Sequence, residues 1–214
     1  MGLEKKLERR RNMIQTAKRL FAEYGFEKTT MQKIADEAGV GVATLFRYFP
    51  KKEHLIIEVV KEVIEQLVPH FEMIIASDKK GIEKIDDVLT AYIQYISKEN
   101  NDSTKLLEAF DLYVAFRPIE KNLLEEINRA YGKIGNIVRE IVKEGKHDGS
   151  IRLSLNDDTD ASTLLNMFGT AVKKYSLYSI LLEDMIVPVP RKNDLIAMKN
   201  ILLSHFEQEK RPSD

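Results

Sequence analysis

The stretch from Thr29 to Glu53, TTMQKIADEAGVGVATLFRYFPKKE, constrains the fold more than any other part of the chain. It predicts two short helices joined by a tight turn. Thr29 and Thr30 offer hydroxyls at a helix start, where the first backbone N–H groups lack partners. Gly39 suits the end of that helix, because glycine adopts left-handed dihedral angles at little cost. Pro50 ends the second helix, since the residue before a proline is displaced from the helical region.

The apolar positions of both segments keep helical spacing. Met31, Ile34 and Ala35 share one face of the first segment. Leu45 and Phe49 face inward at i, i+4 in the second segment. Two short helices with a glycine-containing turn between them form a helix-turn-helix unit, whose second helix enters the DNA major groove. The stretch therefore predicts a DNA-binding unit.

A longer segment, AKRLFAEYGFEKTTMQKIADEAGVGVATLFRYFPKKEHL, resembles the N-terminal domain of the TetR (tetracycline-repressor-like) family of bacterial transcription regulators. The matching features are LF-x-x-x-G-F before the T-T pair, I-A-x-x-A-G-V, T-L-F-R-Y-F and P-x-K-E. The resemblance implies a homodimeric repressor that binds a pseudo-palindromic operator and is released by a small effector. An effector-independent or activating regulator of the same fold is the alternative.

Nine residues are candidates for DNA contact by position: Thr30, Gln32, Val42, Ala43, Thr44, Phe46, Arg47, Tyr48 and Lys52. Arg47 is the natural bidentate donor to guanine, and Thr44 can contact a base edge or a phosphate. Lys52 is expected at the next helix N-terminus, where a phosphate would also meet free N–H groups. For Phe46 and Tyr48 the alternative is packing within the small domain.

Four positions depart from the usual pattern of the family. Gly41 and Lys51 stand where serine or threonine caps are common. Val42 replaces a residue that is commonly polar, and Phe46 replaces a frequent tyrosine, which removes a hydroxyl that could bind phosphate. These changes imply a more apolar recognition helix, and they weaken any transfer of family contacts to positions 42 and 46.

Charge is distributed unevenly along the chain. Residues 1–60 carry 12 Lys and Arg against 8 Asp and Glu, a balance of +4, and the remaining residues have a balance of −5. A basic first part suits contact with phosphates. Five basic residues gather near the N-terminus: Lys5, Lys6, Arg9, Arg10 and Arg11. In the resembled family such an extension often lies near the DNA backbone or minor groove, and a solvated helix face is the alternative.

The rest of the chain predicts an all-α protein of about nine helices. We expect residues 1–53 to bind DNA and residues 54–214 to bind the effector and dimerise. The helices are expected over residues 3–24, the two short segments above, then 52–76 with a kink or break at Pro69, 82–98, 103–116, 118–146, 156–183 and 193–207.

Several classes of function are disfavoured by what the sequence lacks. There is no cysteine, which excludes disulfides and thiol nucleophiles. We find no phosphate-binding glycine loop, HExxH or nucleophile elbow, so neither an enzyme nor a cofactor is expected. The four histidines are scattered, which argues against a metal site. No apolar run approaches the length of a membrane span, and the N-terminal residues lack the apolar core of a signal peptide, so the cytoplasm is the expected location.

The C-terminal part carries aromatic and methionine side chains on helices that the resemblance places around an effector. The candidates are Phe71, Tyr92, Phe110, Tyr113, Phe116, Tyr131, Met167 and Tyr175, with Met73 and Phe168 beside them. They predict an apolar or amphipathic effector, to which tyrosine hydroxyls supply the few polar contacts. Any one of these residues could instead belong to the core. The last two helices are expected to form the homodimer interface, because the first of them is apolar around much of its circumference. The expected interface residues are Leu165, Met167, Phe168, Leu177, Tyr178, Ile180, Leu181 and Leu182 on the first helix, and Ile196, Ile201, Leu202 and Phe206 on the second.

Overall fold

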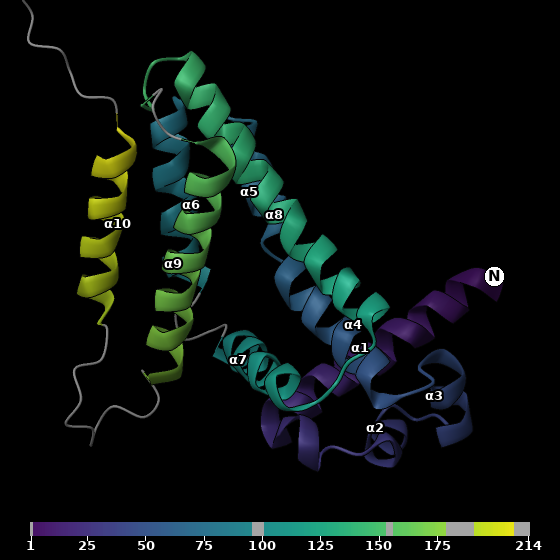
Figure 1. The fold of residues 1–214 in the computed structure, drawn as a ribbon. Helices are drawn as coiled ribbons and strands as arrows, with labels where there is room; N and C mark the ends of the chain where they lie inside the picture. The colour runs from purple at the N-terminus through teal and green to yellow at the C-terminus, as the bar shows by residue number, and fades with distance from the viewer. Residues whose placement is uncertain (1, 96–100, 153–155, 179–190, 208–214) are drawn as a thin grey trace, which may run out of the picture. The chain divides into compact units, whose positions relative to one another are not determined.

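The computed structural model describes residues 2–95, 101–152, 156–178 and 191–207. These residues form helices and no β-strand, so the predicted all-α fold is confirmed. Figure 1 shows the helices in chain order. They are α1 (Gly2–Lys28), α2 (Met31–Glu37), α3 (Val42–Tyr48), α4 (Lys52–Glu65), α5 (Val68–Ile75), α6 (Gly81–Tyr95), α7 (Asn101–Phe116), α8 (Lys121–His147), α9 (Asp157–Tyr178) and α10 (Lys192–Phe206).

Pro69 explains why the described residues hold ten helices where the sequence predicted about nine. The expected helix over residues 52–76 is broken, because α4 ends at Glu65 and α5 begins at Val68. Pro69 then lies in the first turn of α5, where its missing N–H has no helical partner to lose. The predicted helix ends near residues 98 and 183 lie outside the described residues.

The chain divides into two compact units. Unit 1 contains residues 1–65 and 105–130, and unit 2 contains residues 66–104 and 131–214. The domain boundary predicted between residues 53 and 54 falls inside unit 1. A division of function at that boundary stays a prediction.

Unit 1 is built on the packing of α1 against α4 and of α2 against both α1 and α3. Gly25 has a φ of 77° and breaks the helical path of α1, so that the chain turns before α2. Phe26 then points into the core, with its ring centroid 5.0 Å from that of Phe21 and 5.7 Å from that of Tyr113 on α7. The edge-to-face geometry of both pairs is favourable. The last turn of α1 is thereby held from two sides.

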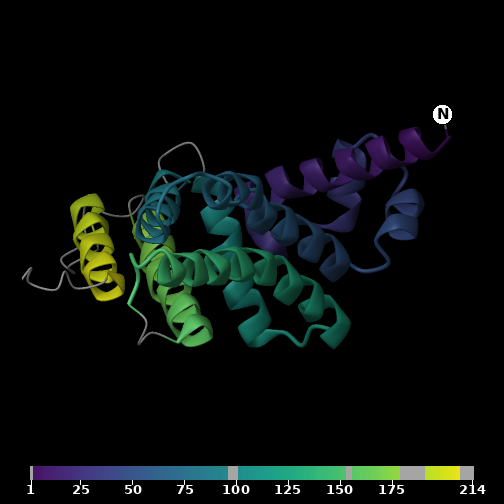
Figure 2. The ribbon, with the colours of Figure 1, turned by 90° about the horizontal axis from the view of Figure 1, so that it is seen from above.

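Unit 2 places α6, α9 and α10 side by side, as Figures 1 and 2 show. The turn after α8 caps α6: the Gly81 N–H donates to Asp148 and the Ile82 N–H to the Ser150 hydroxyl. The buried Lys84 ammonium of α6 donates to the Ile75 carbonyl and to Glu144, each at 2.7 Å. One side chain thus joins α6 to the end of α5 and to α8.

Candidate DNA-binding face and effector site

The start of α2 is held by its two threonines in different ways. The Thr30 hydroxyl is the N-cap and accepts from the Lys33 N–H at 3.1 Å. Thr29 is buried, and its hydroxyl lies within hydrogen-bonding distance of the carbonyls of Leu20 and Gly25. The predicted turn follows α2, with Gly39 at a φ of 67°. The local sequence therefore specifies both ends of this helix.

Helix α3 has a buried side and an outward side, as the sequence predicted. Leu45 and the following Phe49 are buried. Gly41, its N-cap, provides no side-chain hydrogen bond, so packing rather than capping holds this short helix in place.

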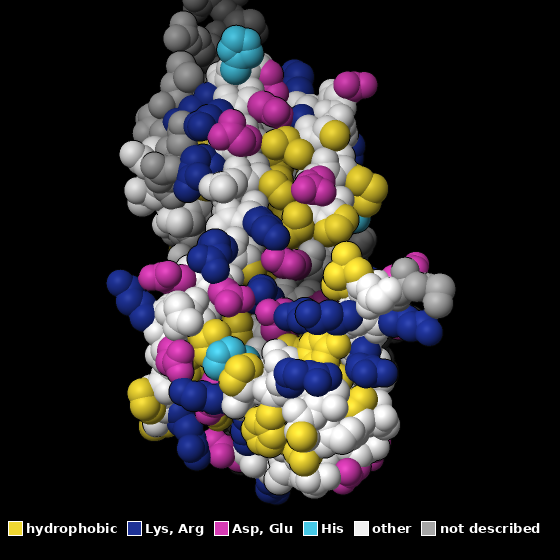
Figure 3. Space-filling model, turned by 90° about the vertical axis from the view of Figure 1, so that its right-hand side faces the viewer, with side chains coloured by type: hydrophobic (Ala, Val, Ile, Leu, Met, Phe, Trp, Pro, Cys, Tyr) yellow, Lys and Arg dark blue, Asp and Glu magenta, His cyan; other side chains and the backbone are white. Residues whose placement is uncertain are grey.

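The outward side of α3 consists of Ala43, Phe46 and Arg47, with Val42, Thr44 and Tyr48 half-buried beside them. Phe46 is 44% exposed, and Arg47 makes no hydrogen bond or ion pair with any residue that the structure describes. A free guanidinium beside an exposed aromatic ring can approach a guanine edge and a thymine methyl. Figure 3 views the face that carries α3 and the start of α1, where Lys and Arg side chains lie among exposed hydrophobic ones.

Other predicted DNA contacts have internal partners. Gln32 donates to Asp36 one turn later at 2.7 Å, and the Tyr48 ring lies 6.4 Å from that of Phe49. Both remain on the same unit as Arg47. The structure therefore brings all nine candidates to α2, α3 and the start of α4, and their contacts with DNA stay predictions.

Lys52 is placed differently from the sequence expectation of an ammonium open to phosphate. Its Nζ donates to the Phe26 carbonyl at 2.7 Å and lies 3.3 Å from the Thr29 carbonyl. The half-buried side chain joins the end of α1 to the start of α4. In this position Lys52 stabilises the turn between α1 and α2.

The five basic residues near the N-terminus fall into two groups, those open to solvent and one that is paired within the chain. Lys5, Lys6, Arg9 and Arg11 are exposed, and none has a polar partner among the described residues. Arg10 instead forms an ion pair with Glu58 at 2.9 Å, and its guanidinium lies 5.3 Å from the centre of the Phe49 ring. Arg10 therefore packs α1 against the residue that follows α3, and the other four residues keep their charge available for phosphate.

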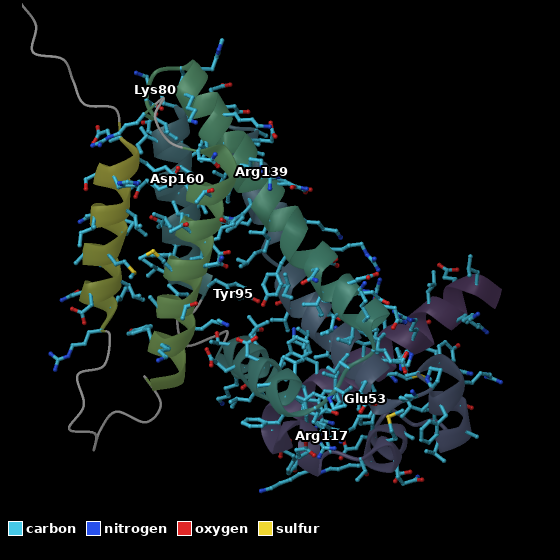
Figure 4. The ribbon with its side chains drawn as sticks, viewed as in Figure 1. Glu53, Lys80, Tyr95, Arg117, Arg139 and Asp160 are labelled. Carbon is cyan, nitrogen blue, oxygen red and sulfur yellow. The ribbon has the colours of Figure 1, made fainter. Side chains whose placement is uncertain are left out.

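The sequence did not indicate that most of α7 and the start of α8 belong to unit 1. The Tyr113 hydroxyl donates to Glu53 at 3.0 Å, and Arg117 pairs with Glu27. Figure 4 labels Glu53 and Arg117 in this region. Burial is the main cause that raises the pKa of Tyr113 to about 12, and the Glu53 carboxylate raises it further. These contacts join residues 60 or more apart in sequence, so no local pattern could have predicted them.

The predicted effector residues are divided between the two units. Phe110, Tyr113 and Phe116 lie in unit 1, where Phe110 is buried and Phe116 is 85% exposed at the end of α7. The other five lie in unit 2: Phe71, Tyr92, Tyr131, Met167 and Tyr175.

Three helices of unit 2 contribute to one aromatic cluster, formed by Phe71 of α5, Tyr92 of α6 and Phe168 of α9. The Tyr92 ring centroid lies 5.4 Å from that of Phe71 and 6.4 Å from that of Phe168, both edge-to-face. Phe71 and Phe168 are fully buried. Burial raises the pKa of Tyr92, and the nearby Tyr131 phenol raises it further. Its hydroxyl therefore stays protonated and can donate a hydrogen bond.

The described part of the chain contains neither a metal site nor a membrane-spanning helix. No group of three or more His, Asp or Glu side chains there could hold a metal ion. None of the helices in the described ranges is long and apolar enough to cross a membrane.

Similarity to known proteins identifies the family of this chain. Residues 13–59 match the family model of the bacterial regulatory proteins, tetR family. The chain belongs to the TetR family. This TetR-family chain is accordingly a DNA-binding transcriptional regulator, and its relatives are regulators rather than enzymes. The family resemblance derived from residues 17–55 is therefore confirmed.

Two curated relatives align well beyond the DNA-binding segment. The fatty acid metabolism regulator protein of Bacillus subtilis (strain 168) is 27% identical over 191 residues, which cover 89% of this chain and 90% of that protein. The HTH-type transcriptional repressor KstR2 of Mycolicibacterium smegmatis is 26% identical over 156 residues, covering 70% of this chain and 71% of that protein.

Among solved structures, the transcriptional regulator FadR from Bacillus subtilis in complex with stearoyl-CoA has the same fold. It matches with a TM-score of 0.64 and 22% identity over 90% of this chain and 95% of that chain.

Proposed function

We propose that this TetR-family chain is a homodimeric repressor that binds a pseudo-palindromic operator and is released from it by a small apolar or amphipathic effector. Residues 1–53 bind DNA in the cytoplasm, and residues 54–214 bind the effector and dimerise. The observation that carries the DNA-binding part is the outward side of α3, where Arg47 is unpaired beside the exposed Phe46. A guanidinium without an internal partner keeps its bidentate donors for a base edge.

The homodimer is supported by the apolar side chains that α9 and α10 expose. Ile201 is 68% exposed on α10, and Ile196 on α10 and Met167 on α9 are also exposed. Phe168 and Phe206, which were expected at the interface, are buried within their own chain. The structure does not describe the side chains of several other expected interface residues (177, 178 and 180–182). A two-fold dimer would present two α3 helices to the two half-sites of an operator.

A long-chain acyl compound is the effector class that we favour. The curated relative aligned over 89% of the chain regulates fatty acid metabolism, and a protein of the same fold was solved with stearoyl-CoA. The aromatic cluster of unit 2 consists of apolar side chains of the kind that line such sites. Release then requires that the effector bind the DNA-free arrangement more tightly than the DNA-bound one.

Selection of bound DNA from a random pool at moderate salt tests the proposal, with acyl compounds then added to the recovered complex. We expect an inverted repeat, two chains per site, and loss of the complex on addition of an acyl effector. Recovery of a single half-site bound by one chain would contradict the homodimer. An effector that strengthens the complex, or an inverted repeat that no compound releases, would contradict release and leave the alternative of an activating or effector-independent regulator.

A further inference from the structure

Helix α3 is too short to hold its own position. It has seven residues, and Gly41 gives its N-terminal end no side-chain cap. An isolated helix of this length is not stable in water. Its closest packing against another helix is with α2. The orientation in which α3 presents its outward side therefore depends on the contacts that hold its two ends.

Two side chains of α1, two positions apart, reach the two ends of α3. The Asn12 amide donates to the Ala38 carbonyl at 3.0 Å, in the turn that leads into α3. The Arg10 guanidinium lies over the ring of Phe49, the C-cap residue of α3, at 5.3 Å from the ring centre. A guanidinium at this distance is attracted by the ring face. Helix α1 thus contacts the chain both before and after α3.

Arg10 is itself fixed by a second contact. Its guanidinium pairs with Glu58 of α4 at 2.9 Å. Phe49 is buried and the Glu58 side chain is only 22% exposed, so both partners are held by their own packing. One side chain therefore ties the end of α3 to α1 and to α4 together.

The same helix carries the four exposed basic residues Lys5, Lys6, Arg9 and Arg11. The helical path of α1 is unbroken from residue 2 to residue 24, so these four residues and the pair formed by Arg10 and Asn12 belong to one rigid segment. Phosphate contacts fix how a protein sits on DNA, and base contacts then supply the sequence preference. The link from α1 to α3 relates one kind of contact to the other.

We propose that Arg10 and Asn12 are positioning residues, which hold α3 in a fixed orientation relative to the exposed basic residues of α1 and thereby set the sequence preference without touching a base. This inference rests on the proposed function, because it assumes that α3 meets the bases. It adds a determinant of specificity that lies outside α2 and α3.

Two variants that leave the basic residues of α1 in place test this role. Asn12→Leu removes the donor to Ala38, and Glu58→Gln removes the charge that holds Arg10. Each should weaken binding to the selected operator about 3- to 10-fold, the scale of one lost polar contact, and leave affinity for scrambled DNA unchanged. Fluorescence anisotropy of the full-length protein over a range of salt concentrations measures both affinities.

Glu62→Gln is the matched control for Glu58→Gln. It removes the same charge one turn later on α4, where Glu62 contacts Gln15 and Lys18 of α1, away from the two ends of α3. It should keep the wild-type ratio of operator to scrambled affinity. Urea denaturation of all variants accompanies the binding curves. Lower stability with an unchanged ratio would show a purely structural role and overturn the inference.

Arg10→Gln separates positioning from a direct contact with phosphate. A positioning role predicts a lower ratio of operator to scrambled affinity and an unchanged slope of log affinity against log salt. A phosphate contact predicts equal weakening on both DNAs and a slope reduced by about one. In that case Glu58→Gln should also bind both DNAs more tightly than Glu62→Gln, because it frees Arg10. Either result would overturn the inference.

The outcomes also separate this inference from the proposed function. If wild type prefers no DNA sequence, the proposed function fails and the role of Arg10 and Asn12 fails with it. If wild type prefers the operator, and Asn12→Leu and Glu58→Gln keep the full ratio, the proposed function stands and the positioning role is overturned.

Discussion

The DNA-binding face and the aromatic cluster of unit 2 differ in how far their side chains are buried. Arg47 faces solvent, and water satisfies its donors until a base edge replaces the water. In the cluster, the half-buried ring of Tyr92 packs edge-to-face on the fully buried rings of Phe71 and Phe168. Arg47 is therefore accessible to DNA as it stands, whereas no ligand can reach the rings of Phe71 and Phe168 without movement of the chain.

The largest effect should follow from the inner side of α3. We expect Leu45→Ala to lower the free energy of unfolding by about 2–5 kcal/mol, because Leu45 is fully buried and its loss leaves a cavity. Phe46→Ala, at the next and exposed position, is the control and should change stability by less than about 0.5 kcal/mol. Urea denaturation measures both. Equal destabilisation by the two variants would mean that the outward side of α3 also holds it in place.

Arg47 should matter for recognition and not for folding. Arg47→Ala is expected to weaken binding to the selected operator by about 1–3 kcal/mol, which is roughly 5- to 150-fold, and to relax the preference at one base pair. Its unfolding curve should match wild type, since the side chain contacts no described polar group. Fluorescence anisotropy with operator and scrambled DNA measures this effect. Uniform weakening on both DNAs would assign Arg47 to phosphate instead of base.

Lys52 distinguishes a residue that contacts DNA from one that stabilises the DNA-binding unit. Lys52→Met keeps much of the apolar stem but loses the hydrogen bonds to Phe26 and Thr29, so we expect about 1–2 kcal/mol of destabilisation. DNA affinity should fall while the slope of log affinity against log salt stays the same. Arg9→Met is the comparison, because loss of a phosphate contact would reduce that slope by about one. A reduced slope in Lys52→Met would show that Lys52 contacts a phosphate, as the sequence predicted.

The smallest effect concerns pH. The folded protein raises the pKa of Tyr113 to about 12, above the ordinary value of 10, so the protonated phenol stabilises the fold below pH 10. That stabilisation is lost as pH rises from 10 toward 12. Between pH 9 and 11.5 wild type should therefore lose about 1 kcal/mol more unfolding free energy than Tyr113→Phe. Parallel losses in the two proteins would show that the fold does not raise the pKa of Tyr113.

The sequence predicted the helix-turn-helix unit well because its determinants are local. The threonine cap, the glycine turn, the buried Leu45 and the proline break each act within a few residues. Residues 105–130 were not predicted as part of unit 1, because the bond between Tyr113 and Glu53 joins residues 60 positions apart. The environment of Lys52 could not be predicted either, since its carbonyl partners lie more than 20 residues away.

The effector residues show the same limit. Spacing along a helix indicates which side chains face inward, but it does not show which helices meet. Phe168 was expected both near the effector and at the dimer interface, and the structure packs it in a cluster with Phe71 and Tyr92 from α5 and α6. Tyr113 was assigned to the effector, and the structure places its hydroxyl against Glu53.

The glycines of α6 and α8 differ in whether the structure leaves room for a larger side chain. A Cβ added at Gly81 would lie 2.2 Å from the Gly145 Cα, and one at Gly145 would lie 2.4 Å from the Ile151 side chain, so the crossing at these two glycines tolerates no larger residue without movement. Gly132 and Gly135, earlier on α8, have open space where a Cβ would go. Alanine at those two sites would raise helix propensity by up to about 1 kcal/mol each. These two substitutions are therefore the first to make in a more thermostable form of the protein.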